Sequence, residues 1–87
     1  MKGFVYILED DAGVYYVGST VDVDFRYEKQ HLKGRTQTTS KMLNPKIVLR
    51  QEYPTIEQAR RIEMKIKRLK RKDYIKKMVT EGRITMK

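Results

Sequence analysis

Three segments have the composition that is typical of β-strands. The first two, Phe4–Leu8 and Val14–Thr20, flank a short polar stretch that ends in Ala12-Gly13, so we expect two strands joined by a tight hairpin. A third strand is predicted at Lys46–Tyr53, because a proline stands directly before it and another directly after it, and proline is confined to the boundaries and edges of sheets.

Apolar residues at helical spacing predict three helices. The first is expected over about residues 22–32, with Asp22 near its start and Lys33-Gly34 after its end. Thr55 caps a long second helix that carries apolar residues from Ile56 to Leu69, and a last helix covers about residues 72–80. The order strand, strand, helix, strand, helix, helix indicates one α+β domain over residues 1–87, with a small, largely antiparallel sheet.

The hairpin brings two tyrosines close together. Tyr6 and Tyr16 fall on adjacent predicted strands, where their phenol groups could converge on one site. The chain contains no cysteine and a single histidine, which excludes thiol nucleophiles and disulfides. If the protein catalyses a reaction, we expect the chemistry to involve these tyrosines.

Charge is distributed unevenly along the chain. Residues 1–31 contain 3 Lys or Arg and 6 Asp or Glu, a net of −3, whereas residues 32–87 contain 17 and 5, a net of +12. Such a basic region favours a polyanionic partner, with nucleic acid first and an anionic membrane surface second; a solvated helix surface explains the charge equally well. No apolar run is long enough to span a bilayer or to form a signal peptide, so we expect a cytoplasmic protein.

One carboxylate falls among apolar positions of the long helix. On a helical wheel Glu63 lies about 40° from Ala59, between Ala59 and Ile56. A carboxylate in an apolar arc must be paired, protonated or bound to a cation, because burial of a bare charge is costly. An ion pair with a nearby lysine or arginine, or a side chain that bends out to water, would also account for Glu63.

Together these residues form a pattern that resembles the GIY-YIG nuclease domain. Its two strand motifs are matched by Phe4-Val5-Tyr6 and Tyr16-Val17-Gly18, Arg26 continues the pattern, and the segment from Ala59 to Lys67 is similar to the helix that bears the metal-binding glutamate. The resemblance covers roughly Lys2 to Lys72 and is strongest to small single-domain members related to structure-specific and excision-repair nucleases. It implies a three-stranded antiparallel sheet flanked by helices and a role in DNA repair or recombination.

The resemblance also implies an activity, the hydrolysis of DNA phosphodiester bonds with one Mg²⁺ or Mn²⁺ ion. Glu63 would hold the metal and Arg26 the scissile phosphate, while Tyr6 or Tyr16 would orient or deprotonate the attacking water. His31 is a further candidate, with a helix cap or a solvent contact as its equally good alternative. We expect DNA rather than RNA as the partner, no membrane, and a protein partner or a homodimer as options. The basic residues predicted to contact nucleic acid are Arg35, Lys41, Arg60, Lys67, Lys70 and Arg71.

The chain departs from the family pattern at two points. Position 30, four residues after Arg26, is Gln30 where a histidine or tyrosine is common, and no asparagine follows Glu63. These departures favour a second hypothesis, a non-catalytic basic module that binds DNA or RNA through the region from Arg60 to Lys77. Composition also allows a ribosome- or membrane-associated basic protein, but that hypothesis does not explain Glu63.

Overall fold

The computed structural model describes residues 1–27 and 42–85, which form three strands and three helices in the predicted order. The strands are β1 (Gly3–Glu9), β2 (Tyr15–Thr20) and β3 (Lys46–Tyr53). The helices are α1 (Val23–Arg26), α2 (Ile56–Leu69) and α3 (Lys72–Glu81). The predicted α+β class is confirmed. Residues 28–32, the second half of the first predicted helix, lie outside the described residues.

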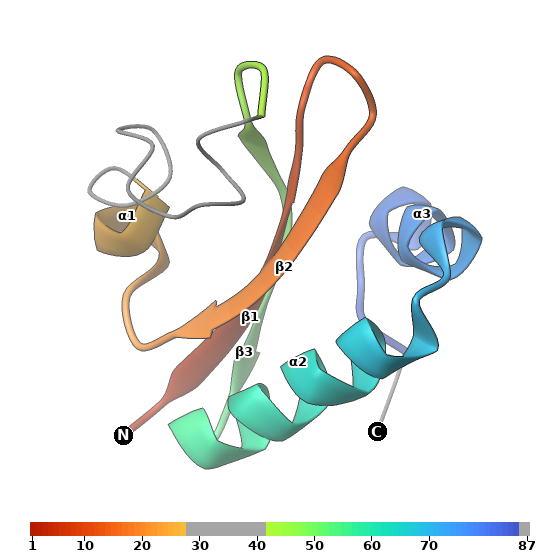
Figure 1. Cartoon of the computed structure of the whole chain (residues 1–87). Coiled ribbons are helices and arrows are strands. Elements are labelled where there is room, and N and C mark those ends of the chain that lie inside the picture. The colour runs from red at the N-terminus through yellow and green to blue at the C-terminus, as the bar shows by residue number, and fades with distance from the viewer. Residues whose placement is uncertain (28–41, 86–87) are drawn as a thin grey trace.

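The sheet is antiparallel, with β1 in the centre and strand order β2-β1-β3. Side chains alternate along β1, so its residues contribute to both faces of the sheet. Val5 and Ile7 pack with α2, whereas Tyr6 and Leu8 pack with Val23 of α1. Figure 1 shows α1 and α2 on opposite sides of the sheet. This strand order makes β2 an edge strand, next to which elements from both faces can meet.

The larger core lies between the sheet and α2. Helix α2 buries one stripe, Ala59, Ile62 and Ile66, against the β1 and β2 side chains, as its apolar spacing predicts. Its N-cap is Thr55, whose hydroxyl accepts a hydrogen bond from Gln58 N at 3.1 Å. Helix α3 adds Met78 to the same core. Within residues 1–27 and 42–85, no helix combines the length and the apolar composition that a membrane span needs.

The hairpin turn between β1 and β2 is fixed by one buried carboxylate. Asp10 Oδ1 accepts hydrogen bonds from Ala12 N at 2.9 Å and Val14 N at 2.7 Å, and its Oδ2 accepts one from Leu43 N at 3.1 Å. These backbone donors, Val14 first, hold the pKa of Asp10 below its ordinary value. Asp10 therefore ties the turn to the segment that leads into β3.

Candidate active site

A cleft of about 340 Å³ lies along the free edge of the sheet. Strand β2, helix α1 and helix α2 all contribute to its wall, so residues from both faces of the sheet meet there. Its lining residues are Tyr16, Gly18, Ser19, Arg26, Arg60, Glu63 and Met64. Three of the sequence-predicted catalytic residues, Tyr16, Arg26 and Glu63, are thus brought together, although 47 positions separate the first from the last.

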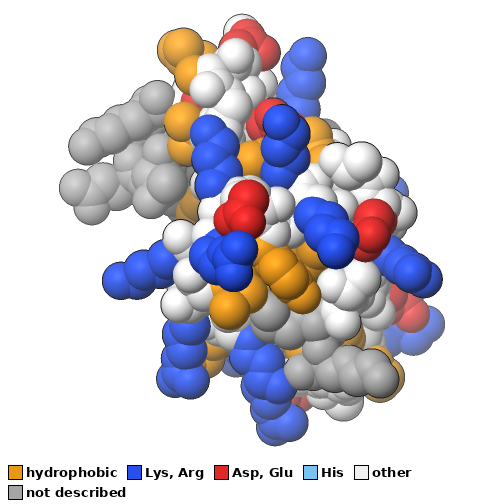
Figure 2. All heavy atoms as spheres, turned by 90° about the vertical axis from the view of Figure 1, so that its right-hand side faces the viewer, with side chains coloured by type: hydrophobic (Ala, Val, Ile, Leu, Met, Phe, Trp, Pro, Cys, Tyr) orange, Lys and Arg blue, Asp and Glu red, His pale blue; other side chains and the backbone are white. Residues whose placement is uncertain are grey.

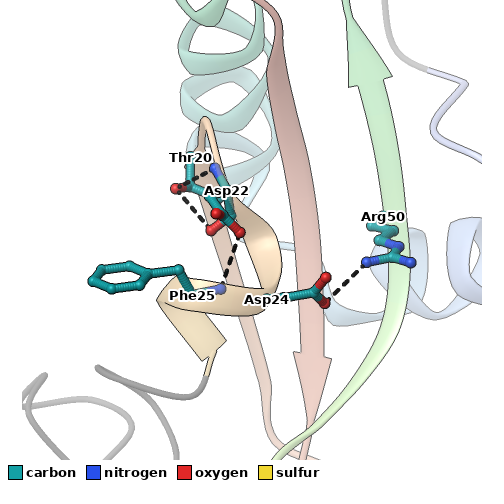
Figure 3. A network of polar contacts seen from close by, with 5 residues as sticks. All are labelled: Thr20, Asp22, Asp24, Phe25 and Arg50. Atoms are coloured by element: carbon teal, nitrogen blue, oxygen red, sulfur yellow. Dashed lines mark hydrogen bonds and ion pairs between the residues drawn. The ribbon is translucent and has the colours of Figure 1, made fainter.

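Helix α1 places Arg26 at this cleft, and a small polar network fixes the start of that helix. Figure 3 shows Asp22 at the N-cap, where its Oδ1 accepts a hydrogen bond from Phe25 N at 3.0 Å. Thr20 Oγ1 in turn accepts a hydrogen bond from Asp22 N at 3.2 Å, which joins the end of β2 to the cap. An ion pair of 3.3 Å between Asp24 and Arg50 ties the helix to β3.

The Arg26 side chain is half-buried and only partly satisfied by the protein. Its guanidinium donates a hydrogen bond to the Tyr6 phenol, an interaction that lowers the pKa of that phenol. Among the described residues, no acceptor pairs with the buried Arg26 Nε. A buried donor without a partner costs free energy, and in this position it can donate to an anion that enters the cleft.

Tyr6 lies behind the cleft and not in its lining, because its side chain is fully buried. It faces Gly18 across the β1–β2 ladder, and a Cβ at position 18 would lie 2.5 Å from the Tyr6 hydroxyl. Glycine is therefore required beside this ring. Burial, followed by the neighbouring Tyr16, raises the pKa of Tyr6 well above its ordinary value, so its hydroxyl stays protonated at neutral pH.

Tyr16 is the tyrosine that lines the cleft. Its ring centroid is 6.3 Å from that of Tyr6, with the ring planes tilted by 38°, a usual geometry for packed aromatic pairs. Unlike Tyr6 it is only half-buried. The predicted convergence of the two phenols is thus present, with one phenol in the cleft wall and the other behind it.

Glu63 reaches the cleft from α2 with a side chain that is 17% exposed. Ser19 Oγ donates a hydrogen bond to Glu63 Oε1, and Lys67 Nζ lies 2.6 Å from Glu63 Oε2. The carboxylate that falls in the apolar arc is therefore paired, which was one of the open alternatives. Lys67 Nζ also stands 5.7 Å from the Tyr16 ring centroid, within the range of a cation–π interaction.

Few protein atoms in the cleft could hold a metal ion. In the described parts of the chain, no three His, Cys, Asp or Glu side chains cluster in a way that could bind one. Glu63 offers carboxylate oxygens and Ser19 offers a hydroxyl. Both are hard oxygen ligands, which suit a small divalent cation that keeps several of its water ligands. The donor set therefore fits such a cation, provided that Lys67 moves away from Glu63.

The predicted nucleic-acid contacts fall into three groups. Arg60 lines the cleft and Lys67 contacts Glu63, whereas Lys70 and Arg71 line a different cavity near the start of α3. Two further predicted contacts, Arg35 and Lys41, lie outside the described residues, as does the catalytic candidate His31.

Sequence reasoning missed the roles of two residues, one at the cleft and one in the hairpin turn. Ser19 anchors Glu63, and the signal for it is its position two residues after the buried Val17, on the face of β2 that packs against α2. Asp10 is the other. Its side chain is turned into the hairpin, where it accepts hydrogen bonds from the backbone N–H groups of Ala12 and Val14. No pattern of apolar residues signals the role of Asp10.

The chain belongs to the GIY-YIG catalytic domain family, which matches residues 2–78. Membership implies a nuclease that acts on nucleic acid, and nucleases of this family typically use a divalent metal ion. The chain is 37% identical over 73 residues to the UPF0213 protein BH0048 of Halalkalibacterium halodurans, which covers 83% of this chain and 77% of that protein.

A solved structure has the same fold. It is the solution NMR structure of the UPF0213 protein BH0048 from Bacillus halodurans, which superimposes with a TM-score of 0.58 at 32% sequence identity. The match covers 94% of this chain and 87% of that one. The arrangement of strands and helices described above is therefore shared by a homologous protein.

Proposed function

We propose that this protein is a divalent-metal-dependent endonuclease that hydrolyses DNA phosphodiester bonds. The observation that carries the proposal is the pairing, in one cleft, of an anion-binding group with a cation-binding group. Arg26 presents a buried Nε that has no acceptor among the described residues, and Glu63 presents a carboxylate. A scissile phosphate and a metal ion bound to it need this combination.

In the proposed reaction a water oxygen bonds to phosphorus while the bond from phosphorus to the leaving sugar oxygen breaks. The water loses one proton and the leaving oxygen gains one, so the products are a phosphate monoester and a free hydroxyl. Arg26 binds the scissile phosphate and stabilises the charge that develops on it, because a planar guanidinium can donate two charge-assisted hydrogen bonds. Glu63 and Ser19 hold the Mg²⁺ or Mn²⁺ ion, which supplies Lewis-acid stabilisation of the phosphate when bound.

The two tyrosines have different roles in this proposal. Tyr16 lines the cleft, so it is the phenol within reach of an attacking water and we assign it the orientation or deprotonation of that water. Tyr6 is buried behind it and its raised pKa keeps the hydroxyl protonated. Tyr6 therefore acts as a positioning residue for Arg26 rather than as a base.

Recognition in this proposal depends on the DNA backbone and on branched shape more than on sequence. The cleft is lined by few side chains, and Arg26 and Arg60 are its only cations among the described lining residues. Cationic side chains contact phosphates, which fix register but carry no sequence information. We therefore expect DNA substrates whose backbone is accessible, such as flapped and branched DNA.

The test is cleavage of supercoiled plasmid and of flap DNA with Mg²⁺, with Mn²⁺ and with chelator. Metal-dependent cleavage by the wild type should fall by about 10²-fold or more in Arg26→Ala and Glu63→Gln. Arg83→Ala and Glu81→Gln remove the same charges from exposed positions outside the cleft and should cleave as the wild type does. Equal residual cleavage in all five proteins would identify a contaminating nuclease and contradict the proposal.

One observation favours the alternative, a DNA- or RNA-binding module without turnover. Lys67 occupies one Glu63 oxygen and Ser19 the other, which leaves the carboxylate paired without any metal. The same experiment separates the two functions. Binding of flap DNA without metal-dependent cleavage, and without an effect of Glu63→Gln on binding, would establish the module instead.

A further inference from the structure

A second cavity, here called the junction pocket, lies where the hairpin turn meets the connection between α2 and α3. It has a volume of about 390 Å³. The hairpin contributes an apolar side and the helix connection contributes a basic one. Its lining residues are Val14, Tyr15, Lys70, Arg71, Lys72 and Ile75.

The junction pocket combines apolar surface with unneutralised positive charge. Val14 is 46% exposed, so the hairpin side of the pocket presents apolar surface to solvent. Lys72 Nζ stands 6.0 Å from the centroid of the Tyr15 ring, whereas Arg71 is paired with Asp73 at 2.8 Å. In the described parts of the chain no carboxylate forms an ion pair with Lys70 or Lys72.

Lys70 has a backbone conformation that lysine rarely adopts. It is the C-cap of α2 with φ 50° and ψ 34°, the left-handed region in which glycine is the usual residue. A lysine there costs stability that a glycine would not. Lys67 and Arg68 already place basic groups in the last turn of α2. A favourable interaction with the helix dipole therefore does not require a third basic residue at position 70. The unfavourable conformation therefore points to a function of the Lys70 ammonium.

A basic stripe connects the junction pocket to the candidate active site. Arg60 and Lys67 are seven residues apart, which places them along one side of α2, and Lys70 follows at the C-cap of that helix. Arg60 lines the cleft and Lys70 lines the pocket, about 15 Å apart along the helix axis. Figure 2 shows further Lys and Arg side chains spread over the face that carries α3, around a small apolar patch.

We propose that the junction pocket binds an unpaired nucleotide of the DNA strand that leaves the active-site cleft. This deepens the proposed function and rests on it. The separation of about 15 Å corresponds to roughly four nucleotides of a B-form strand, and to fewer if the strand is extended. Lys70 and Lys72 contact phosphate, and Val14, Tyr15 and Ile75 contact the base. An unpaired base fits better than a duplex, because its apolar faces are not stacked inside a helix.

The test measures binding of fluorescein-labelled flap DNA by anisotropy in the presence of chelator, with single-stranded arms of two or eight nucleotides. We expect the wild type to bind the longer arm several-fold more tightly. Lys70→Gln and Val14→Glu should abolish that gain, and Lys70→Gln should reduce the slope of log affinity against log salt by about 0.7 on the longer arm. Lys46→Gln removes the same charge from an exposed position at the start of β3, outside the pocket, and should retain the gain.

A second variant separates function from folding. Lys70→Gly should raise the melting temperature, because glycine adopts positive φ without strain, and should lose the arm-length gain as Lys70→Gln does. An arm-length gain that survives Lys70→Gln and Val14→Glu would overturn the proposal. Displacement of the long arm by a poly-glutamate peptide, at a concentration that leaves the short-arm complex intact, would overturn it in favour of a general acidic-ligand site.

Cleavage of the short-arm substrate with Mg²⁺ keeps the two proposals apart. If Lys70→Gln cleaves the short-arm substrate as the wild type does and loses only the long-arm gain, the junction pocket and the nuclease assignment are both supported. If the wild type cleaves no substrate but binds the long arm through Lys70, the nuclease proposal fails while the pocket retains its ligand.

Discussion

Lys67 Nζ lies 2.6 Å from Glu63 Oε2, so an ammonium group already stands at the carboxylate that the proposed function assigns to a divalent cation. The second carboxylate oxygen accepts a hydrogen bond from Ser19. A metal ion that binds Glu63 must therefore displace Lys67. This ion pair holds the carboxylate in place without metal, and it would compete with a metal ion for Glu63.

Replacement of Lys67 by methionine is expected to tighten metal binding. A half-exposed i,i+4 ion pair contributes about 0.5–1 kcal/mol, so its removal should lower the dissociation constant about two- to fivefold. The measurement is Mn²⁺ titration by calorimetry, supported by Tb³⁺ luminescence sensitised by nearby tyrosine. Arg60→Met removes a charge from the same cleft without breaking the pair. An equal increase in metal affinity in both variants would show that the effect comes from the total positive charge of the cleft and not from displacement of Lys67.

Gly18→Ala is expected to destabilise the fold and to impair cleavage. The added Cβ would lie 2.5 Å from the Tyr6 hydroxyl and 2.9 Å or less from two ring carbons, and the ring is fully buried. Insertion of a methyl group into a packed interior costs about 1–3 kcal/mol, measured as the free energy of unfolding in urea. Tyr6→Leu should relieve the clash, so Gly18→Ala should cost less in that background. Strictly additive effects would contradict the contact.

The stability of the protein should fall above pH 10 in a manner that depends on Tyr6. Burial raises the pKa of Tyr6 above its ordinary value of 10, so the folded state retains a proton that the unfolded state releases. The resulting stabilisation is fully present below pH 10 and is lost as the pH rises further. Urea unfolding of the wild type and of Tyr6→Phe between pH 8 and 11.5 tests this. The free energy of unfolding of Tyr6→Phe should decline less steeply with pH than that of the wild type. The decline that remains in the variant is due in part to Tyr15 and Tyr53, whose pKa values are also raised.

Asp22→Ala should impair catalysis through Arg26, although Asp22 is exposed and does not line the cleft. Loss of an N-cap costs about 0.5–2 kcal/mol and would loosen the start of the four-residue α1, which carries Arg26. We expect weaker cleavage with Asp22→Ala and recovery with Asp22→Asn or Asp22→Ser, since both replacements can cap a helix. Failure of these replacements to restore cleavage would indicate that the charge of Asp22 matters and not its hydrogen bond.

The fold could be predicted from sequence because its elements have strong local signals. Two prolines bound Lys46–Tyr53, and β3 has those same limits. Thr55 was expected as a cap and accepts the capping hydrogen bond. The break near Lys70 was anticipated, but its left-handed conformation was not, because a lysine carries no sequence signal for positive φ.

The candidate site could be predicted only in part. The helical wheel identified Glu63 as misplaced in an apolar arc, yet it could not identify Lys67 and Ser19 as its partners. One of them is a turn away on the same helix and the other lies 44 residues earlier, on an adjacent strand. Side-chain pairing over such sequence distances depends on tertiary packing, which periodicity does not encode.

By itself the sequence determined the element order and the family, and it named the residues that we propose bind phosphate and metal. These depend on local patterns: alternation in strands, helical spacing, caps and short motifs. Only the tertiary structure decided which tyrosine lines the cleft. Tyr6 is in the central strand and is covered from both sides, whereas Tyr16 is in the edge strand, where the cleft lies. The order of strands in the sheet, a non-local property, separates two residues that the sequence presents as equivalent.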